Sequence, residues 1–162
     1  MFERKLPKIK NYEKFPKVNP TVDVACFNIS HTYMLLGRKK NENRLRLIGG
    51  FVDPDLDNSF DNAIIREFEE ETGGELVNVE YICSMRVDDK RFRESSDKIF
   101  TTLFYGQILN DTNIQPADDI ICIQWVELNA LFENRLEDWI VSEHIDLVKK
   151  ALEFVTQNKP SS

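Results

Sequence analysis

Short runs of apolar and β-branched residues recur along most of the chain, separated by polar or turn-forming stretches, and this pattern predicts strands. The expected strands cover residues 21–29, 32–36, 45–48, 76–85, 99–109 and 120–126. We expect the first two to form a hairpin around Ser30 and His31, and the third to stop at Gly49 and Gly50. The near-continuous apolar run of the last one is typical of a buried strand.

Two further segments have the helical period. Residues 59–72 begin at Ser59, a preferred N-cap residue, and are followed by Gly73, which suits a C-terminal cap. The apolar positions suited to burial on this helix are Ile64, Ile65 and Phe68. A second helical stripe runs through Ile140, Ile145, Val148, Leu152 and Val155. Strands on both sides of one helix, with another helix closing the chain, predict an α/β fold whose mixed sheet is packed between helices.

The length of 162 residues predicts one domain, and the formal net charge of −7 argues against nucleic-acid binding, which needs a basic surface. Residues 1–20 are expected to form an N-terminal arm, residues 21–157 the domain, and residues 158–162 a disordered tail. The sequence has no apolar run of membrane-spanning length and no signal-peptide core, so we expect a cytoplasmic protein without a membrane partner. The expected reduced core cysteines are Cys26, Cys83 and Cys122.

Three carboxylates share one face of the first helix. Glu67, Glu70 and Glu71 fall within an arc of about 100°, because residues three and four apart lie on the same side. A glutamate-rich helical segment is most often a solvated face. However, like charges at this spacing destabilise a helix, and oxygen ligands gathered together suit Mg²⁺ or Mn²⁺. The helix is therefore a candidate metal site.

The neighbours of these carboxylates favour the metal-site interpretation. A double glycine lies upstream at residues 49–50, and an arginine directly precedes the first glutamate. The residues that form the pattern are Arg66, Glu67, Phe68, Glu70, Glu71 and Gly73. In this order they resemble the second half of the Nudix box, Arg-Glu-apolar-x-Glu-Glu-x-Gly.

The first half of the box departs from the family pattern. Its usual glutamate falls at Asn58, and the loop between Gly50 and Arg66 is longer than the commonest form. In the family, that glutamate is mainly a partner of the box arginine. We therefore expect Asp57 or Asp53 to pair with Arg66 in its place.

The resemblance implies a Nudix α/β/α sandwich with a mixed central sheet, and hydrolysis of the pyrophosphate bond of a nucleoside diphosphate linked to another moiety. It also implies Mg²⁺ as the cofactor, with Mn²⁺ as an alternative. The implied metal ligands are the backbone carbonyl of Gly50 and the carboxylates of Glu67, Glu70 and Glu71. Glu70 and Glu71 are also expected to be catalytic, and Arg66 to orient the carboxylates through hydrogen bonds.

The general base has several candidates. Asp118 and Asp119 lie in a loop before a strand, and Glu94 and Asp97 lie in the charged loop of residues 86–98. One of the glutamates on the helix is a further alternative. We rank Asp118 and Asp119 first, although aspartates are also common in ordinary turns.

ADP-ribose is the first expected substrate, and NADH or a related dinucleotide the second, because the Gly-Gly-Phe-Val-Asp-Pro run resembles the branch of ADP-ribose pyrophosphatases. The residues expected to bind the substrate are Arg46, Phe51, Arg91 and Arg93. The alternatives are a non-catalytic nucleotide sensor, motivated by Asn58, and a (d)NTP-sanitising pyrophosphohydrolase. A small-molecule nucleotide is thus the expected partner, a homodimer is compatible with the sequence, and His31 and His144 are assigned no role.

Overall fold

The computed structural model of the protein describes residues 16–110 and 113–159. The strands are β1 (Val18–Phe27), β2 (Tyr33–Lys39), β3 (Ile48–Phe51), β4 (Leu76–Val87), β5 (Lys98–Ile108) and β6 (Ile120–Glu127). The helices are α1 (Phe60–Thr72), α2 (Leu128–Glu133), α3 (Leu136–Trp139) and α4 (Ile145–Asn158), with short 3₁₀ turns η2 (Lys90–Phe92) and η3 (Ser142–His144). Among the described residues, no helix combines the length and apolar character needed to cross a membrane.

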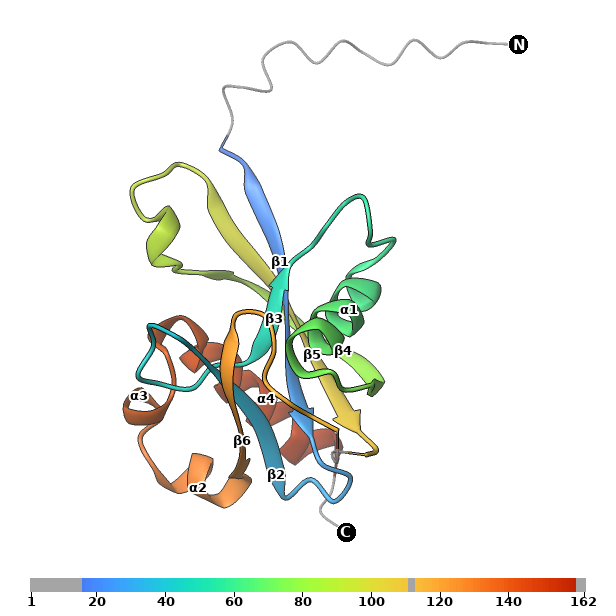
Figure 1. Cartoon of the computed structure of the whole chain (residues 1–162). Helices are drawn as coiled ribbons and strands as arrows, with labels where there is room; N and C mark the ends of the chain where they lie inside the picture. The colour runs from blue at the N-terminus through green and yellow to red at the C-terminus, as the bar shows by residue number, and fades with distance from the viewer. Residues whose placement is uncertain (1–15, 111–112, 160–162) are drawn as a thin grey trace, which may run out of the picture.

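The six strands form one mixed sheet with β1 at its centre (Figure 1). The strand order is β4-β5-β1-β2-β6, and β3 pairs with the lower-numbered part of β1 beside the β1–β2 pairing. β1 and β5 run parallel, whereas the other strand pairs are antiparallel. The predicted hairpin is confirmed, because Phe27 pairs with Met34 across a turn in which His31 has a φ of 54°.

The sheet is covered by α1 on one face and by α4 on the other (Figure 1). Ala63, Ile64 and Phe68 of α1 pack into one buried cluster with Val22 and Ile48 of the sheet. The core residues of α4 belong to a separate buried cluster on the opposite face; they are Leu147, Val148, Ala151, Leu152 and Val155. Alternate residues of β1, β2 and β5 thus serve two cores. The expected α/β/α sandwich with a mixed sheet is confirmed.

The prediction of a strand that stops at the double glycine was wrong. Gly49 and Gly50 lie inside β3 and pair with Asp23 and Val22 of β1, and neither has a positive φ. What requires glycine here is space, since a Cβ on Gly49 would collide with the carbonyl oxygen of Val22 and one on Gly50 with the carboxylate of Glu67. The glycines therefore allow close packing of β3 rather than a turn.

Burial also differs from the prediction at two places. β6 is an edge strand with exposed positions at Ile121 and Gln124, so it is not the buried strand that its apolar run predicted. Ile65 of α1, expected to be buried, is 39% exposed because it faces away from the sheet side occupied by Ile64 and Phe68. An apolar run or arc does not by itself determine which side another element covers.

The two ends of the predicted domain shift slightly. β1 begins at Val18, and residues 18–20 pair with residues 98–100 of β5 rather than belonging to an arm. At the other end, Lys159, assigned to the tail, forms an ion pair of 2.9 Å with Glu80. Residues 1–15 of the expected arm and residues 160–162 of the expected tail lie outside the described residues.

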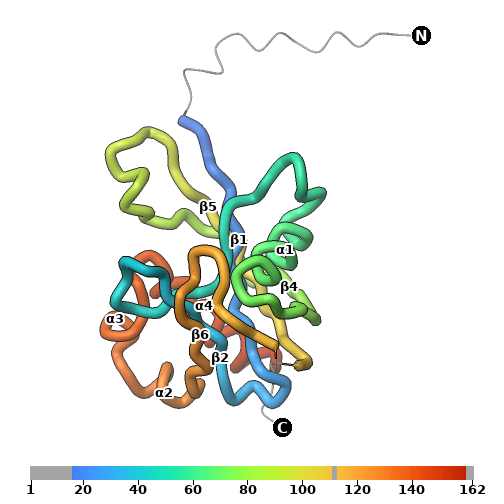
Figure 2. Tube along the Cα trace, in the orientation of Figure 1, coloured from blue at the N-terminus to red at the C-terminus, as the bar shows by residue number. Residues whose placement is uncertain are grey.

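The three cysteines are free thiols. Cys26 is buried in the core, where burial raises the pKa of its thiol, and Cys83 and Cys122 are half-buried. Two long loops, the one between β3 and α1 and the one between β4 and β5, project from the same end of the sheet (Figure 2).

Candidate active site

Helix α1 is fixed at both ends by local chemistry. The Ser59 Oγ accepts a hydrogen bond of 3.1 Å from the backbone N–H of Asn62, as expected of an N-cap. At the other end, Gly73 has a φ of 68° and donates its N–H to the carbonyl of Glu69 at 2.7 Å. These caps fix where the helix begins and ends, whereas the packing of Ala63, Ile64 and Phe68 against the sheet sets the direction in which each glutamate points.

Glu71 and Glu67 point from α1 toward the glycines of β3. The Glu71 side chain is buried, and its Oε2 accepts a hydrogen bond of 3.3 Å from the Gly49 N–H. The Glu67 carboxylate lies against the backbone of Gly50, in the space that a Cβ would fill. Burial raises the pKa of Glu71 to about 7, and burial likewise raises the pKa of Glu67. Two desolvated carboxylates next to a bare strand backbone form a site that favours a cation.

Every N–H group of the Arg66 guanidinium donates a hydrogen bond. Its Nε and Nη2 donate to the two oxygens of Asp57, each at 2.8 Å, and Nη2 also donates to the Phe51 carbonyl at 3.1 Å. Its Nη1 donates to Glu67 at 2.9 Å and to Glu70 at 3.1 Å. A guanidinium has five N–H groups, and each has an acceptor here.

The partner of Arg66 is thus Asp57, one of the two residues predicted for this role. The other, Asp53, shapes the loop instead, because its carboxylate accepts the N–H of Asp55 at 2.8 Å and its own N–H donates to Asp57 at 2.8 Å. The Asp57 side chain is only 1% exposed, and its hydrogen bonds with Arg66 lower the pKa of its carboxyl. Asn58 is exposed and takes no part in this pairing.

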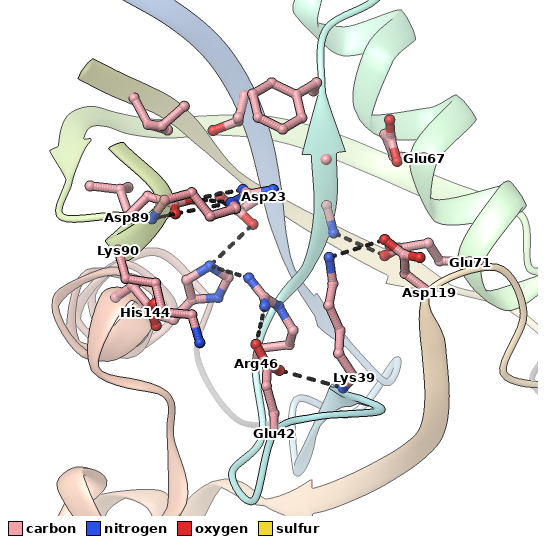
Figure 3. A pocket seen from close by; sticks show the side chains of 18 of the residues that line it. Asp23, Lys39, Glu42, Arg46, Glu67, Glu71, Asp89, Lys90, Asp119 and His144 are labelled. Carbon is pink, nitrogen blue, oxygen red and sulfur yellow. Dashed lines mark hydrogen bonds and ion pairs between the residues drawn. The ribbon is translucent and has the colours of Figure 1, made fainter. Parts of the chain in front are cut away.

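A cleft of about 550 Å³ opens beside these carboxylates. It is lined by β1, the β2–β3 connection, β3, α1, the loop between β4 and β5, the segment before β6, and η3. Figure 3 shows Glu67 and Glu71 on one side of it and Arg46, Lys90 and His144 on the other. The cleft is therefore lined by the carboxylates of α1 on one wall, whereas the opposite wall mixes the basic Arg46 and Lys90 with the acidic Asp23, Glu42 and Asp89.

Five of the predicted base and substrate residues line this cleft: Arg46, Phe51, Arg91, Asp118 and Asp119. The Arg91 guanidinium lies 5.4 Å from the centre of the Phe51 ring and is held by Asp89. Asp118 has a φ of 51°, a left-handed conformation that aspartate tolerates, and its charge contributes to the raised pKa of Glu67. Asp119 forms an ion pair of 3.5 Å with Lys39.

The other predicted residues do not line the cleft. Glu70 is held by Arg66, and its side chain is 48% exposed. Arg93 pairs with Asp88 at 3.1 Å in the exposed loop. The alternative bases Glu94 and Asp97 are likewise absent from the lining, and Asp97 accepts a hydrogen bond from the backbone of Lys17 at 3.0 Å.

Sequence reasoning missed the polar groups at the floor of the cleft. Asp23 on β1 and His144 before α4 both line the cleft and are both buried, and His144 had been assigned no role. Their single weak sequence clue is an aspartate within an apolar strand pattern, Val-Asp-Val-Ala. Their meeting depends on the register of β1 against β3 and on a contact between residues 47 and 144, 97 positions apart.

The donor set fits a small hard cation. Within residues 16–110 and 113–159, no three His, Cys, Asp or Glu side chains meet closely enough to enclose a metal by themselves. Mg²⁺ does not need such a cage, because it usually binds one or two carboxylates and completes its shell with water and substrate phosphates. Glu67, Glu71 and the Gly50 backbone supply oxygen donors of this kind on one side of an open cleft.

A sequence model of the family described as "NUDIX domain" matches residues 17–149. The NUDIX domain of Shewanella oneidensis NrtR, solved as a complex with ADP ribose, has a TM-score of 0.72 and 19% identity, covering 96% of this chain and 99% of that one. A MutT/nudix family protein from Enterococcus faecalis has a TM-score of 0.68 and 21% identity, over 89% of this chain and 64% of that one. The MutT protein of Methanosarcina mazei Go1 has a TM-score of 0.66 and 21% identity, over 90% and 98%. These structures show the same fold, and among curated proteins none matches significantly.

Proposed function

The chain belongs to the NUDIX domain family, and on this premise we propose that it is a Mg²⁺-dependent pyrophosphohydrolase acting on a nucleoside diphosphate joined to a second moiety, with ADP-ribose as first choice and NADH as second. The observation that carries the proposal is the pair of carboxylates on α1, the buried Glu71 and the half-buried Glu67, which face a cleft of about 550 Å³ whose opposite wall includes Arg46 and Lys90. A diphosphate between these walls would meet a cation site on one side and guanidinium and ammonium groups on the other.

In this proposal Glu67, Glu71 and the Gly50 carbonyl hold the cation. When bound, Mg²⁺ supplies electrostatic stabilisation of the charge that develops on the phosphate oxygens. Arg66 keeps Glu67 oriented through the bond to its Oε1. Glu70 would join from the rim if its bond with Arg66 opens.

The residues of the rim have separate roles. Asp118 and Asp119 are the first candidates to take a proton from the attacking water, because both line the cleft next to α1. Arg91 neutralises phosphate charge, Arg46 contacts the substrate from the floor of the cleft, and Phe51 offers an aromatic face to a base. These assignments follow from position and chemistry at the cleft.

A second candidate function is nucleotide binding without hydrolysis. It is favoured by Glu70, which is exposed and tied to Arg66 outside the lining of the cleft, and by Asn58 at the position of the usual box glutamate. The similarity to the NrtR domain that was solved with ADP ribose agrees with either candidate.

Release of AMP separates the two. We expect the protein to release AMP from ADP-ribose with Mg²⁺ and to lose this activity in EDTA. The panel should include NADH and dGTP at the same Mg²⁺ concentration. Tight binding of ADP-ribose without turnover of any substrate would favour the sensor. A kcat/KM for dGTP at least tenfold above that for ADP-ribose would replace our substrate class with nucleoside triphosphates.

A further inference from the structure

Three buried polar side chains from distant parts of the chain meet at the floor of the cleft. The Thr101 hydroxyl on β5 donates to Asp23 Oδ2 on β1 at 2.6 Å. The other oxygen of Asp23, Oδ1, lies 3.7 Å from His144 Nε2. The side chains of Asp23 and His144 are only 9% and 5% exposed, yet both residues line the cleft (Figure 3).

The backbone fixes which nitrogen of His144 carries the proton. The Leu47 N–H donates to Nδ1 of His144 at 3.0 Å, so Nδ1 holds a lone pair and no hydrogen. Burial lowers the pKa of His144, which keeps the ring neutral near pH 7. A neutral imidazole has one N–H, and that hydrogen must therefore be on Nε2.

With the proton on Nε2, the contact between His144 and Arg46 is not a hydrogen bond. Nη2 of Arg46 lies 3.3 Å from Nε2 of His144, but both nitrogens carry hydrogen and neither accepts. The Arg46 guanidinium is held in place by Glu42 through its Nη1. The two side chains therefore present converging donors that do not satisfy each other.

An acceptor stands beside these donors. Asp23 Oδ1 is too far from Nε2 for a hydrogen bond at 3.7 Å, and among the described residues no hydrogen bond to this oxygen is formed. The floor thus offers two N–H donors and one carboxylate oxygen within a space of a few ångströms. A group that accepts and donates at once satisfies all three.

A hydroxyl has this chemistry, whereas a phosphate does not. A hydroxyl oxygen accepts from His144 or Arg46 while its hydrogen is donated to Asp23. An ionised phosphate oxygen only accepts, and it would be repelled by the buried carboxylate. The floor is also close to the cation site, because Asp23 pairs with Gly49, whose N–H donates to Glu71.

We propose that Asp23, His144 and Arg46 form a subsite for a sugar hydroxyl of the substrate, next to its diphosphate. The proposal rests on the proposed function and narrows its substrate class to nucleoside diphosphates joined to a sugar. The base then lies toward Phe51 and Arg91 at the mouth, where an aromatic face is available.

The test compares two substrates that differ only in the hydroxyls. ADP-ribose and the β-tetrahydrofurfuryl ester of ADP share the diphosphate diester and the five-carbon ring ether, and both release AMP, but the tetrahydrofurfuryl group has no hydroxyl. We expect the wild type to prefer ADP-ribose in kcat/KM by about 10- to 100-fold, the effect of a hydrogen bond to a charged group. Asp23→Asn turns the acceptor into a donor, and His144→Asn keeps an acceptor for the Leu47 N–H but removes Nε2.

Each of these variants should reduce the preference at least tenfold. The matched control is His31→Asn, which replaces a histidine outside the cleft and should leave the preference as in the wild type. A wild type without preference, or variants that keep it, would overturn the proposal. IDP-ribose, which differs from ADP-ribose only in its base, is the third substrate. If the variants change the preference between ADP-ribose and IDP-ribose instead of the preference for hydroxyls, the proposal is also overturned.

Calorimetric titration of the wild type keeps the test independent of the variants and of catalysis. Binding of ADP-ribose at least tenfold tighter than the tetrahydrofurfuryl ester supports the subsite even if both variants fail to fold, and equal affinities refute it. If no substrate is hydrolysed while this difference in binding is present, the proposed hydrolysis fails and the hydroxyl subsite stands.

Discussion

Asp57→Asn tests whether an aspartate has replaced the usual glutamate as the partner of Arg66. The substitution keeps the size of the side chain and removes its charge. In the wild type, both carboxylate oxygens accept from Arg66 at 2.8 Å, and the Asp57 side chain is 1% exposed. An asparagine retains one acceptor and places an NH₂ group against the guanidinium, which breaks one of the two bonds.

The expected loss of stability depends on the hydrogen bonds that Arg66 keeps in the variant. Breaking a fully buried ion pair costs about 3–5 kcal/mol, because it leaves one charge without compensation. Arg66 is 21% exposed and still donates to Glu67, Glu70 and the Phe51 carbonyl, so its charge is partly compensated. We therefore expect a loss of about 2 kcal/mol in the free energy of unfolding, which lowers the Tm of a domain of this size by about 4–8 °C.

The loss should depend on pH in a defined direction. Arg66 lowers the pKa of Asp57 in the folded state, so the pair stabilises the protein above the unfolded pKa, about 3.9, and this stabilisation disappears as the pH falls through the folded value. Denaturation in urea at pH 7 and at pH 3 measures it. Asp55→Asn is the control, since it removes the same charge from the same loop without touching Arg66.

A second arm introduces the family glutamate. Because all five N–H groups of Arg66 have acceptors, Asn58→Glu alone should change stability by less than about 0.5 kcal/mol and the rate of hydrolysis by less than about threefold. In the Asp57→Asn background it should recover part of the loss. A tenfold gain in activity from Asn58→Glu alone, or wild-type stability of Asp57→Asn at pH 7, would refute the idea that Asp57 saturates Arg66.

Three further predictions concern α1 and β3. Glu71→Gln should cut kcat by more than about 100-fold. It should also stabilise the metal-free protein at pH 8 but not at pH 4, because the rise in the pKa of Glu71 from its ordinary value of 4.5 to about 7 costs about 3 kcal/mol, and this cost develops as the pH rises through that range; activity assays and denaturation at both pH values decide. Gly50→Ala should displace the Glu67 carboxylate and weaken Mg²⁺ binding at least tenfold with little loss of helix content, and an unchanged affinity by calorimetry would contradict the contact. Ser59→Ala should cost about 1 kcal/mol through the lost bond to the Asn62 N–H, and unfolding in urea that matches the wild type would disprove it.

The acidic helix was predictable because its determinants are local. The cap at Ser59, the left-handed Gly73 and the spacing of Glu67 from Glu71 all depend on residues within a few positions of one another. The sequence did not decide whether Asp53 or Asp57 pairs with Arg66, because the answer depends on the conformation of the β3–α1 loop. In the structure, the backbone N–H of Asp53 donates to Asp57, which fixes the latter toward Arg66.

The floor of the cleft was not predictable for a different reason. Asp23 reaches it through the pairing of β1 with β3, and His144 through a bond to Leu47 that no local pattern encodes. The same limit explains the strand β6, whose Val126 and Ile120 join the cores on opposite faces of the sheet although the strand itself forms the edge. Local periodicity predicts elements, whereas strand order and register determine which side chains meet.

The compensation of charge along α1 indicates where a cation is needed most. Glu70 and Glu67 both accept hydrogen bonds from Arg66, so part of the repulsion on this face is already offset within the protein. Glu71 has no such bond; it is buried and receives one long hydrogen bond from the Gly49 N–H, and burial raises the pKa of its carboxyl to about 7. In the proposed metal site, a divalent ion held by Glu71 would offset the charge of this buried carboxylate, while Arg66 holds the neighbouring carboxylates in place. In this arrangement Arg66 compensates Glu67 and Glu70, and the cation compensates Glu71. The saturation of all Arg66 donors fits this arrangement, since a mobile guanidinium with free donors would compete with the cation for the oxygens of Glu67.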